Sequence, residues 1–485
     1  MKLGKIFLVL VLIVVPISIG VLAYKQVQKT GELFQQLAGE SVLNLVLNSS
    51  TATGTTSQSG LAHLAAGFEA PQTYLVLLLN NTEMRPGGGF IGAYGVVRIS
   101  GGVPEILQLE GTELLDGRSG GLGLSAPPVP LASHIKNLKK WYFRDSNWSP
   151  DFALSSQNSL EIYKKENGQY ASEITGVIGI TPTVFENVIS IVGPVTVDGM
   201  EFNEKNFTEK LEYEVEYGFA HRGEQFNERK NLLPKMASAL MVKVSAGVFE
   251  NWAKYYDLYK QMVAQKQLLA YFVDPEMQSA ARQMGFAGEM KKFGGDYLLW
   301  ADANLGALKT DLAIQRELTY SWEKTVAGTK ARASMKYRHA GKFDWRTSRY
   351  LTYARIFVPE GSKLVGVSEI VNGKKSVAKE IESGVENGRQ WFGAFMSIEP
   401  GTTEDLVFEY WLPEKITRQI TAGDYSFLAQ KQLGLNNVKL TVNWDFGKNI
   451  ETAQPAETGK VLNDSKYLYQ TDLNVDRDFV VKLGK

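Results

Sequence analysis

The fold of this chain is decided by residues 74–99, which read YLVLLLNNTEMRPGGGFIGAYGVVRI. Residues 74–79 form an unbroken apolar run, which is typical of a strand buried on both faces. Residues 80–90 carry asparagine, proline and three consecutive glycines, so they are expected to turn the chain. Residues 91–99 then indicate a second strand. We therefore expect two strands joined by a glycine-rich turn.

Residues 155–197 alternate between helical and extended patterns. Thr181 and Pro182 suit the N-cap and the first turn of a helix. Strands that alternate with helices indicate an α/β layer fold. The expected elements are a helix over residues 155–166, a strand over 174–180, a helix over 181–191 and a strand over 195–197.

A long amphipathic stretch, residues 231–268, follows and predicts one or two helices broken near Gly247. Residues 297–303 then indicate another strand. We assign residues 61–312 to an α/β core with this added helical segment. The core ends at residue 312, where the sequence pattern changes again.

Residues 313–485 show strand patterns without intervening helices. From Val438 to Phe446, apolar residues alternate with polar ones, and residues 351–358 and 406–411 are strand-like. Turn signals recur between these strands, for example at Asn372-Gly373. Short strands and frequent turns are typical of an antiparallel β-sandwich, which we therefore expect here.

The N-terminus predicts a membrane anchor. Residues 6–24 carry no charge, and such a helix would span about 30 Å, the thickness of the bilayer core. Lys2 and Lys5 precede it and favour a cytoplasmic N-terminus. We expect residues 1–29 to be a transmembrane helix with its flanks, and residues 30–60 a stalk helix and flexible linker. The chain would then be a single-pass cell-membrane protein with its bulk extracytoplasmic; a cleaved signal peptide is the alternative.

Composition narrows the function classes. Among 485 residues, 52 Lys and Arg balance 52 Asp and Glu, so no basic excess suggests a nucleic-acid partner. The chain has no cysteine, which excludes disulfides and thiolate chemistry. Its four histidines lack the spacing of metal ligands; they are His63, His134, His221 and His339. We therefore predict no histidine metal site.

Several motifs resemble the bacterial "domain of unknown function 4012" family of membrane-anchored proteins. The resemblance covers the chain from about residue 72 to 445, and the family has no established activity. The segments that carry it are Asn80–Gly92 (NNTEMRPGGGFIG), Arg144–Phe152 (RDSNWSPDF), Asp296–Leu298, Asp302–Asp311 (DANLGALKTD) and Tyr353–Gly361.

The α/β region is also distantly similar to LytR-CpsA-Psr proteins, which move glycopolymers from polyprenyl-pyrophosphate carriers onto the cell wall. The similarity rests on an Arg-containing turn after a buried strand, on the helix–Gly/Pro–strand unit of residues 184–197, and on the basic cluster around His221. It implies an α-β-α core in which Arg85, Arg222 and Arg229 hold a pyrophosphate, and guanidinium groups suit phosphate oxygens.

The sequence departs from the transferase pattern at the acidic positions. The transferases carry Arg-Ser-Asp-Thr at the first turn, where the acid helps to hold a divalent metal. Here the turn reads Arg85-Pro86-Gly87-Gly88, and the later Arg-Asp motif is replaced by Glu110-Gly111-Thr112-Glu113. Mg²⁺ therefore stays a candidate cofactor without an assigned ligand set.

Other residues allow both a functional and a structural interpretation. Gly87 and Gly88, next to Glu83, could offer backbone N–H groups to a phosphate, or they could serve a turn that needs positive φ. Asp145 and Asp151 could act as general acid and base, or they could cap and turn the chain around Ser149-Pro150. His221 is the one histidine beside a candidate site.

Three functions remain open from the sequence. The first is an envelope protein that binds a cell-envelope glycopolymer or its polyprenyl-(pyro)phosphate precursor. The second is an active phosphotransferase of the LytR-CpsA-Psr type, which would require Arg85, Arg222 and Arg229 to converge on one apolar pocket. The third is a structural or adhesive surface protein without chemistry.

Overall fold

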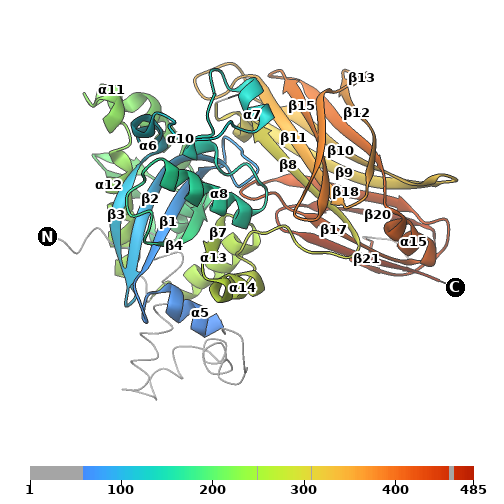
Figure 1. The fold of residues 1–485 in the computed structure, drawn as a ribbon, viewed down its shortest axis with the longest axis horizontal. Helices are drawn as coiled ribbons and strands as arrows, with labels where there is room; N and C mark the ends of the chain where they lie inside the picture. Colours follow the sequence, from blue (N-terminus) through green and yellow to red (C-terminus); the bar gives the residue numbers. More distant parts are fainter. Residues whose placement is uncertain (1–57, 248–249, 307, 458–463, 485) are drawn as a thin grey trace, which may run out of the picture.

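The computed structural model describes residues 58–247, 250–306, 308–457 and 464–484. It is a mixed α/β structure whose C-terminal region is all β, and Figure 1 shows these two regions side by side. The predicted anchor, residues 1–29, and nearly all of the predicted stalk and linker, residues 30–60, lie outside the described residues. Within the described residues, none of the helices has the length and apolar character needed to cross a membrane.

The N-terminal region is built on a five-stranded mixed sheet. Its strand order is β3-β2-β1-β4-β7, with β1 in the centre. β1 pairs antiparallel with β2 and parallel with β4. The strands are β1 (Gln72–Asn80), β2 (Phe90–Ser100), β3 (Val103–Gly111), β4 (Ile174–Ile180) and β7 (Leu268–Phe272). The stretch 74–99 therefore forms the central strand and its neighbour, as its pattern predicts.

Helices cover both faces of this sheet, because alternate side chains of β1 point to opposite faces and those of residues 74–79 are mostly aliphatic. Leu75, Leu77 and Leu79 face α8 (Phe152–Lys165), with the short helices on that side. Tyr74 and Val76 face the other layer of helices. That layer consists of α5 (Gln58–Ala65), α9 (Pro182–Val192), α13 (Trp252–Ala264) and α14 (Pro275–Gln283).

A cover of short elements lies between β4 and β7 in sequence and packs beside α9. Its core joins Val195 and Phe207 to the apolar side of α12. The cover contains β5 (Val195–Val197), β6 (Met200–Phe202), α10 (Phe207–Tyr213), the π-helix η4 (Glu214–Gly218), α11 (Phe219–His221), η5 (Phe226–Glu228) and α12 (Leu232–Gly247). The remaining short helices of this region are α6 (Thr112–Ser119), α7 (Val129–His134) and η3 (Phe143–Asp145).

Two details of this region differ from the sequence-based expectation. Thr181 stands at the N-cap of α9, but its hydroxyl donates to Gln267 Oε1 at 2.6 Å instead of capping the helix. The helical pattern of residues 231–268 includes Leu268, which is the first residue of β7. A short apolar strand cannot be separated from a buried helix end by periodicity alone, which explains this error.

The C-terminal region consists of two seven-stranded sheets. One has the order β13-β12-β16-β10-β9-β18-β20, and the other β14-β15-β11-β8-β17-β21-β19. Their shared core is rich in aromatic side chains, including Trp444, Tyr320 and Phe427. One short helix, α15 (Glu414–Ala422), packs at its end.

The strands of these two sheets are β8 (Asp296–Asn304), β9 (Ile314–Thr325), β10 (Gly328–His339), β11 (Tyr350–Pro359), β12 (Lys363–Val371), β13 (Lys374–Val377), β14 (Lys379–Glu386), β15 (Arg389–Ile398), β16 (Thr403–Trp411), β17 (Asp424–Gln430), β18 (Val438–Asp445), β19 (Ile450–Gln454), β20 (Lys466–Asp472) and β21 (Arg477–Leu483).

The sandwich is not purely antiparallel, which corrects the prediction for residues 313–485. β18 pairs parallel with β9, and β17 pairs parallel with β8. β8 lies on the α/β side of the division expected between residues 312 and 313, and yet it sits inside a sandwich sheet. Residues far apart in sequence form these pairs, so no local pattern reveals them.

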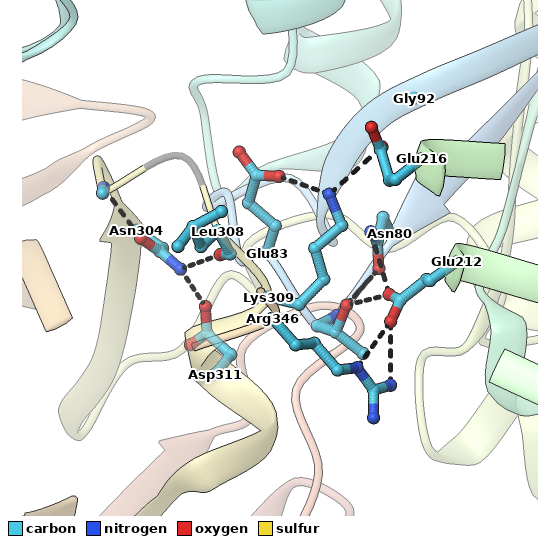
Figure 2. Close-up of polar contacts among 12 residues, drawn as sticks. Asn80, Glu83, Gly92, Glu212, Glu216, Asn304, Leu308, Lys309, Asp311 and Arg346 are labelled. Atoms are coloured by element: carbon cyan, nitrogen blue, oxygen red, sulfur yellow. Dashed lines mark hydrogen bonds and ion pairs between the residues drawn. The ribbon is translucent and has the colours of Figure 1, made fainter. Parts of the chain in front are cut away.

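The turn of residues 80–90 forms a joint between the two regions. Met84 N donates to Asp311 Oδ2 at 2.8 Å, and Asn304 N donates to Met84 O at 2.9 Å. Asp311 belongs to η6 (Thr310–Ala313), and Figure 2 shows its contact with Asn304. Leu433, from the sandwich side, is buried in the core under α8. The joint therefore places residues of the sandwich beside the α/β sheet.

Candidate functional site

An apolar cavity of about 270 Å³ lies between the sheet and the cover. Strands β1 and β2 line it with Val76, Leu78, Ala93 and Gly95, and the cover contributes side chains that include Ala237. Ala93 and Gly95 are too small to fill the space in front of β2, which is a physical reason why the cavity stays open. An apolar cavity with a few polar groups at one end is typical of a ligand site.

Charged side chains gather at the mouth of this cavity. Lys230 Nζ lies 2.6 Å from Glu113 Oε2, and Arg229 Nη2 lies 3.0 Å from Glu113 Oε1. Arg229 Nη1 also lies 2.9 Å from Glu216 Oε2. Lys309 Nζ approaches the other oxygen of Glu216 at 3.6 Å, and Figure 2 shows Lys309 between two carboxylates. Each of these cations therefore shares its carboxylate with another cation of the cluster.

Burial and pairing act against each other in this cluster. Burial lowers the pKa of the Lys230 ammonium, although Glu113 opposes the change. Burial would raise the pKa of Glu113, but Lys230 and Arg229 outweigh it and hold that pKa below its usual value. Burial would likewise lower the pKa of Lys309, but Glu83 and Glu216 outweigh it and raise that pKa. Glu113 therefore stays anionic between its two cations.

The π-helix η4 shapes the mouth. Val215 lines the apolar cavity, Glu216 lies at its mouth, and Tyr217 lines a second cavity beside it. Three consecutive residues of η4 thus contribute to the lining of two cavities. A single π turn within a helical segment often marks a functional position, because it widens the turn and redirects side chains.

Arg85 lies in the joint rather than at the apolar cavity. Its side chain is 3% exposed, and its Nε lies 3.1 Å from Asp145 Oδ1. Its Nη1 donates to the carbonyls of Met84 and Asn304. Glu83, the nearest other acid, is 3.5 Å from Nη2. Arg85 thus uses its donors on the protein itself.

Arg222 and His221 lie away from both cavities. Arg222 forms ion pairs with Glu214 and Glu224, and it lines neither cavity. His221 is exposed at the end of α11. Arg229 alone, of the three predicted arginines, reaches the apolar cavity. The three arginines therefore do not converge on one pocket.

The glycines of residues 87–89 serve the turn. Gly87 N donates to Asn147 O at 3.0 Å, and Gly88 N donates to Arg85 O at 3.0 Å. A Cβ on Gly87 would lie 2.7 Å from that same Asn147 oxygen. Gly88 has a φ of 115°, which favours glycine. These two N–H groups are used within the joint and leave no cradle for a phosphate.

The two predicted acid and base residues both have structural partners. Asp151 Oδ1 accepts from Leu154 N at 3.0 Å and caps α8, and its Oδ2 accepts from Met290 N at 2.8 Å. Asp145 pairs with Arg85 and, at 3.7 Å, with Arg144. Neither carboxylate lines the apolar cavity.

A buried pair of acids lies behind Arg144. Arg144 Nη1 donates to Asp116 Oδ2 at 2.9 Å. Burial raises the pKa of Asp116 to about 8, with repulsion from Glu166 as the second cause and Arg144 opposing both. Burial also raises the pKa of Glu166. The pair therefore holds a proton at neutral pH and sets the position of Arg144, which lines both cavities.

The described residues offer no fitting site for Mg²⁺. No group of three or more His, Asp or Glu side chains in the described ranges is arranged to hold a metal. Glu113 is bound by two cations, and Glu110 is held by Arg118 and the Tyr94 hydroxyl.

Sequence reasoning missed three members of this site. They are Lys309, Glu216 and Arg144, which the structure brings to one mouth from three separate segments. Lys309 and Arg144 do occur in motifs that carry the family resemblance. Glu216 had no such signal, since a π turn leaves no clear mark in a sequence.

The comparisons support part of the resemblance. A family model described as "Protein of unknown function (DUF4012)" matches residues 69–215, which contain the sheet centre and part of the cover. No curated protein matches the chain. The likeness to LytR-CpsA-Psr proteins stays a prediction.

Similar solved structures add little. One is a Legionella pneumophila protein named as a nutrient binding protein, 8% identical, which covers 39% of this chain and 71% of its own at a TM-score of 0.26. Another is an M1 zinc metallopeptidase from Deinococcus radiodurans, 11% identical, at a TM-score of 0.18. It covers 39% of this chain and 42% of its own. TM-scores this low do not indicate a shared fold.

Proposed function

We propose that this chain is a membrane-anchored, extracytoplasmic envelope protein that binds a polyprenyl-phosphate or polyprenyl-pyrophosphate lipid, the precursor of an envelope glycopolymer. The apolar cavity takes one end of the prenyl chain, and the charged mouth takes the anionic head. The observation that carries this proposal is an apolar cavity of about 270 Å³ that opens at a cluster of cations.

The size and lining of the cavity support a long apolar chain. Its volume is near the lower end of the range for ligand pockets, roughly 300 Å³, so it suits a few isoprene units next to the head rather than a whole polyprenyl chain. Each buried methylene contributes about 0.8 kcal/mol. The rest of the chain would stay in the bilayer beside the predicted anchor of residues 6–24.

The mouth supports an anionic head group. Glu216 is the more exposed of the two acids on Arg229, at 37% against 24% for Glu113. It lies between Arg229 and Lys309, where a phosphate would lie. A phosphate that displaces Glu216 gains two charge-assisted partners, while Glu113 keeps Lys230 in place.

The transfer reaction is not part of the proposal. It was expected to need Arg85, Arg222 and Arg229 at one pocket, and only Arg229 lines the apolar cavity. Binding without chemistry needs only the cavity and its mouth.

Filling the cavity tests the proposal. Ala237→Phe places a ring in the cavity from α12, and Val242→Phe places the same ring on the solvent side of that helix, where Val242 is 65% exposed. The full chain in detergent is titrated with a polyprenyl phosphate, and retained lipid is measured by native mass spectrometry. We expect Ala237→Phe to lose binding at least tenfold and Val242→Phe to bind as the unaltered chain does.

A second readout keeps this test decisive. Thermal unfolding of both variants checks that each is folded, since a ring that fills a cavity need not destabilise the core. Equal lipid binding by a folded Ala237→Phe variant would overturn the proposal, as would failure of the unaltered chain to bind any polyprenyl phosphate.

A further inference from the structure

A second cavity, of about 300 Å³, adjoins the mouth of the first. Phe90, Arg144, Glu216 and Lys309 line both cavities, so the two spaces meet at the proposed head-group position. The second cavity is lined on its far side by Trp345, which comes from the β10–β11 loop of the sandwich. It therefore exists only because the sandwich packs beside the cover.

Aromatic rings form one wall of the second cavity. Tyr217 and Trp345 line it, with ring centroids 5.6 Å apart and planes at 86°. Tyr213 packs against both rings, at 6.0 Å and 5.5 Å. Tyr217 is 45% exposed although it lies within this cluster. The wall thus presents ring surface that the protein does not cover.

The loop that carries Trp345 is held firmly. Asp344 Oδ1 accepts from Arg346 N at 2.9 Å and from Thr347 N at 2.8 Å. Arg346 reaches across to Glu212 of the cover at 2.8 Å, a contact that Figure 2 shows. Trp345 is therefore positioned before any ligand arrives, which lowers the entropic cost of binding.

The charged part of the lining is balanced. Arg85, Arg144 and Lys309 line the cavity together with Glu83, Asp145 and Glu216, so three cations accompany three anions. Glu83 is 4% exposed, and its contacts to Arg85 and Lys309 are long, at 3.5 and 3.7 Å. Its oxygens therefore retain acceptor capacity. A neutral ligand with many donors and acceptors suits such a lining better than a second anion does.

We infer that the second cavity is a saccharide subsite, which holds the sugar unit attached to the phosphate of the lipid. This inference rests on the proposed function, because the shared mouth then holds the phosphate. A pyranose ring has an apolar C–H face that is attracted to the negative face of an aromatic ring. Its hydroxyl groups match the charged side chains in the rest of the lining. Lipid chain, phosphate and sugar would lie in order along the two cavities.

The test compares two lipids on matched variants of the full chain. Trp345→Ala removes the ring from the second cavity, and Phe343→Ala removes a 63% exposed ring from the same loop that lines neither cavity. Each variant is titrated with a polyprenyl phosphate and with the same lipid carrying one sugar on its phosphate. We expect Trp345→Ala to lose about tenfold in affinity for the glycosylated lipid only, equivalent to about 1.4 kcal/mol.

The outcomes separate the inference from the proposed function. Equal affinity of the unaltered chain for both lipids, with no selective effect of Trp345→Ala, would overturn the saccharide subsite and leave the lipid site standing. Binding of neither lipid would overturn the proposed function and the subsite together. A selective loss in Phe343→Ala as well would also count against the subsite, since that ring lies outside the cavity.

Discussion

Arg85 and Arg229 carry the same side chain and lie in neighbouring parts of the molecule, but they serve different ends. Arg85 is enclosed in the joint, where a carboxylate and two carbonyls use its donors. Arg229 lies at the mouth of an apolar cavity, paired with Glu113, which is 24% exposed, and with Glu216, which is 37% exposed. The difference shows that an arginine beside a glycine-rich turn is no sign of a phosphate site until the partners of its guanidinium are known.

The largest expected effect separates these two arginines directly. Arg85→Ala leaves Asp145 buried with one distant cation, and loss of one partner of a buried pair costs about 3–5 kcal/mol. Arg229→Ala should cost far less stability, on the order of 1 kcal/mol, because Glu113 keeps Lys230. Urea denaturation followed by circular dichroism measures both free energies of unfolding.

For ligand binding, Arg229→Ala and not Arg85→Ala should have the larger effect. Arg229→Ala is expected to weaken polyprenyl-phosphate binding by roughly tenfold or more, as the loss of a charge-assisted hydrogen bond implies. An Arg85→Ala variant that stays as stable as the unaltered chain would break the comparison, because the joint would then not depend on its guanidinium.

A middle-sized effect concerns Asp116, which holds Arg144 where it lines both cavities. Burial raises the pKa of Asp116 from 3.8 to about 8, so the folded chain holds a proton that the unfolded chain releases above about pH 4. The folded state therefore binds more protons between these values, and the free energy of unfolding should fall as pH rises from about 4 to about 8. Each pH unit is worth at most about 1.4 kcal/mol.

Asp116→Asn should remove this part of the pH dependence. We expect the unaltered chain to lose about 2 kcal/mol between pH 5 and pH 7 relative to the variant, from urea midpoints at each pH. Glu105→Gln, at an exposed carboxylate of β3, is the matched control and should leave the dependence unchanged. Parallel pH profiles for the unaltered chain and Asp116→Asn would show that the acid pair is not protonated in the folded state.

The smallest effect sharpens the account of the mouth. Glu216→Gln removes the charge that competes with a phosphate for Arg229 and Lys309. We expect polyprenyl-phosphate affinity to rise about threefold, equivalent to roughly 0.7 kcal/mol. The affinity for a polyprenol, which has no phosphate, should stay the same. Weaker phosphate binding in this variant would mean that Glu216 helps to bind the ligand instead of competing with its phosphate.

Much of the fold could be predicted from local pattern. The apolar run of residues 74–79 is the central strand, and the strand and helix expected at residues 174–191 occur as β4 and α9. These elements were visible because burial imposes a period on the sequence. β7 could not be predicted, since a short apolar strand has no distinctive period. The parallel pairs of the sandwich could not be predicted either, since pairing partners leave no local signal in the sequence.

The candidate site could be predicted only in part. Arg229 was singled out as one of a group of basic residues, and it does line the apolar cavity. Arg85 and Arg222 belonged to the same hypothesis, but neither lines the apolar cavity and each is held by protein groups. Spacing along the chain could not distinguish them, because it does not say which side of a turn faces a cavity.

The sequence by itself determined most of the elements, because helices and buried strands must bury apolar side chains at their own periods. It also restricted the chemistry, since a chain without cysteine offers no thiolate. Only the tertiary structure decided which charges meet. It brought Arg144 and Glu216, from two segments of the α/β region, together with Lys309 and Trp345, from two loops of the sandwich. These contacts depend on how whole layers pack against each other. Such packing involves many segments at once, so the sequence of one segment does not reveal it.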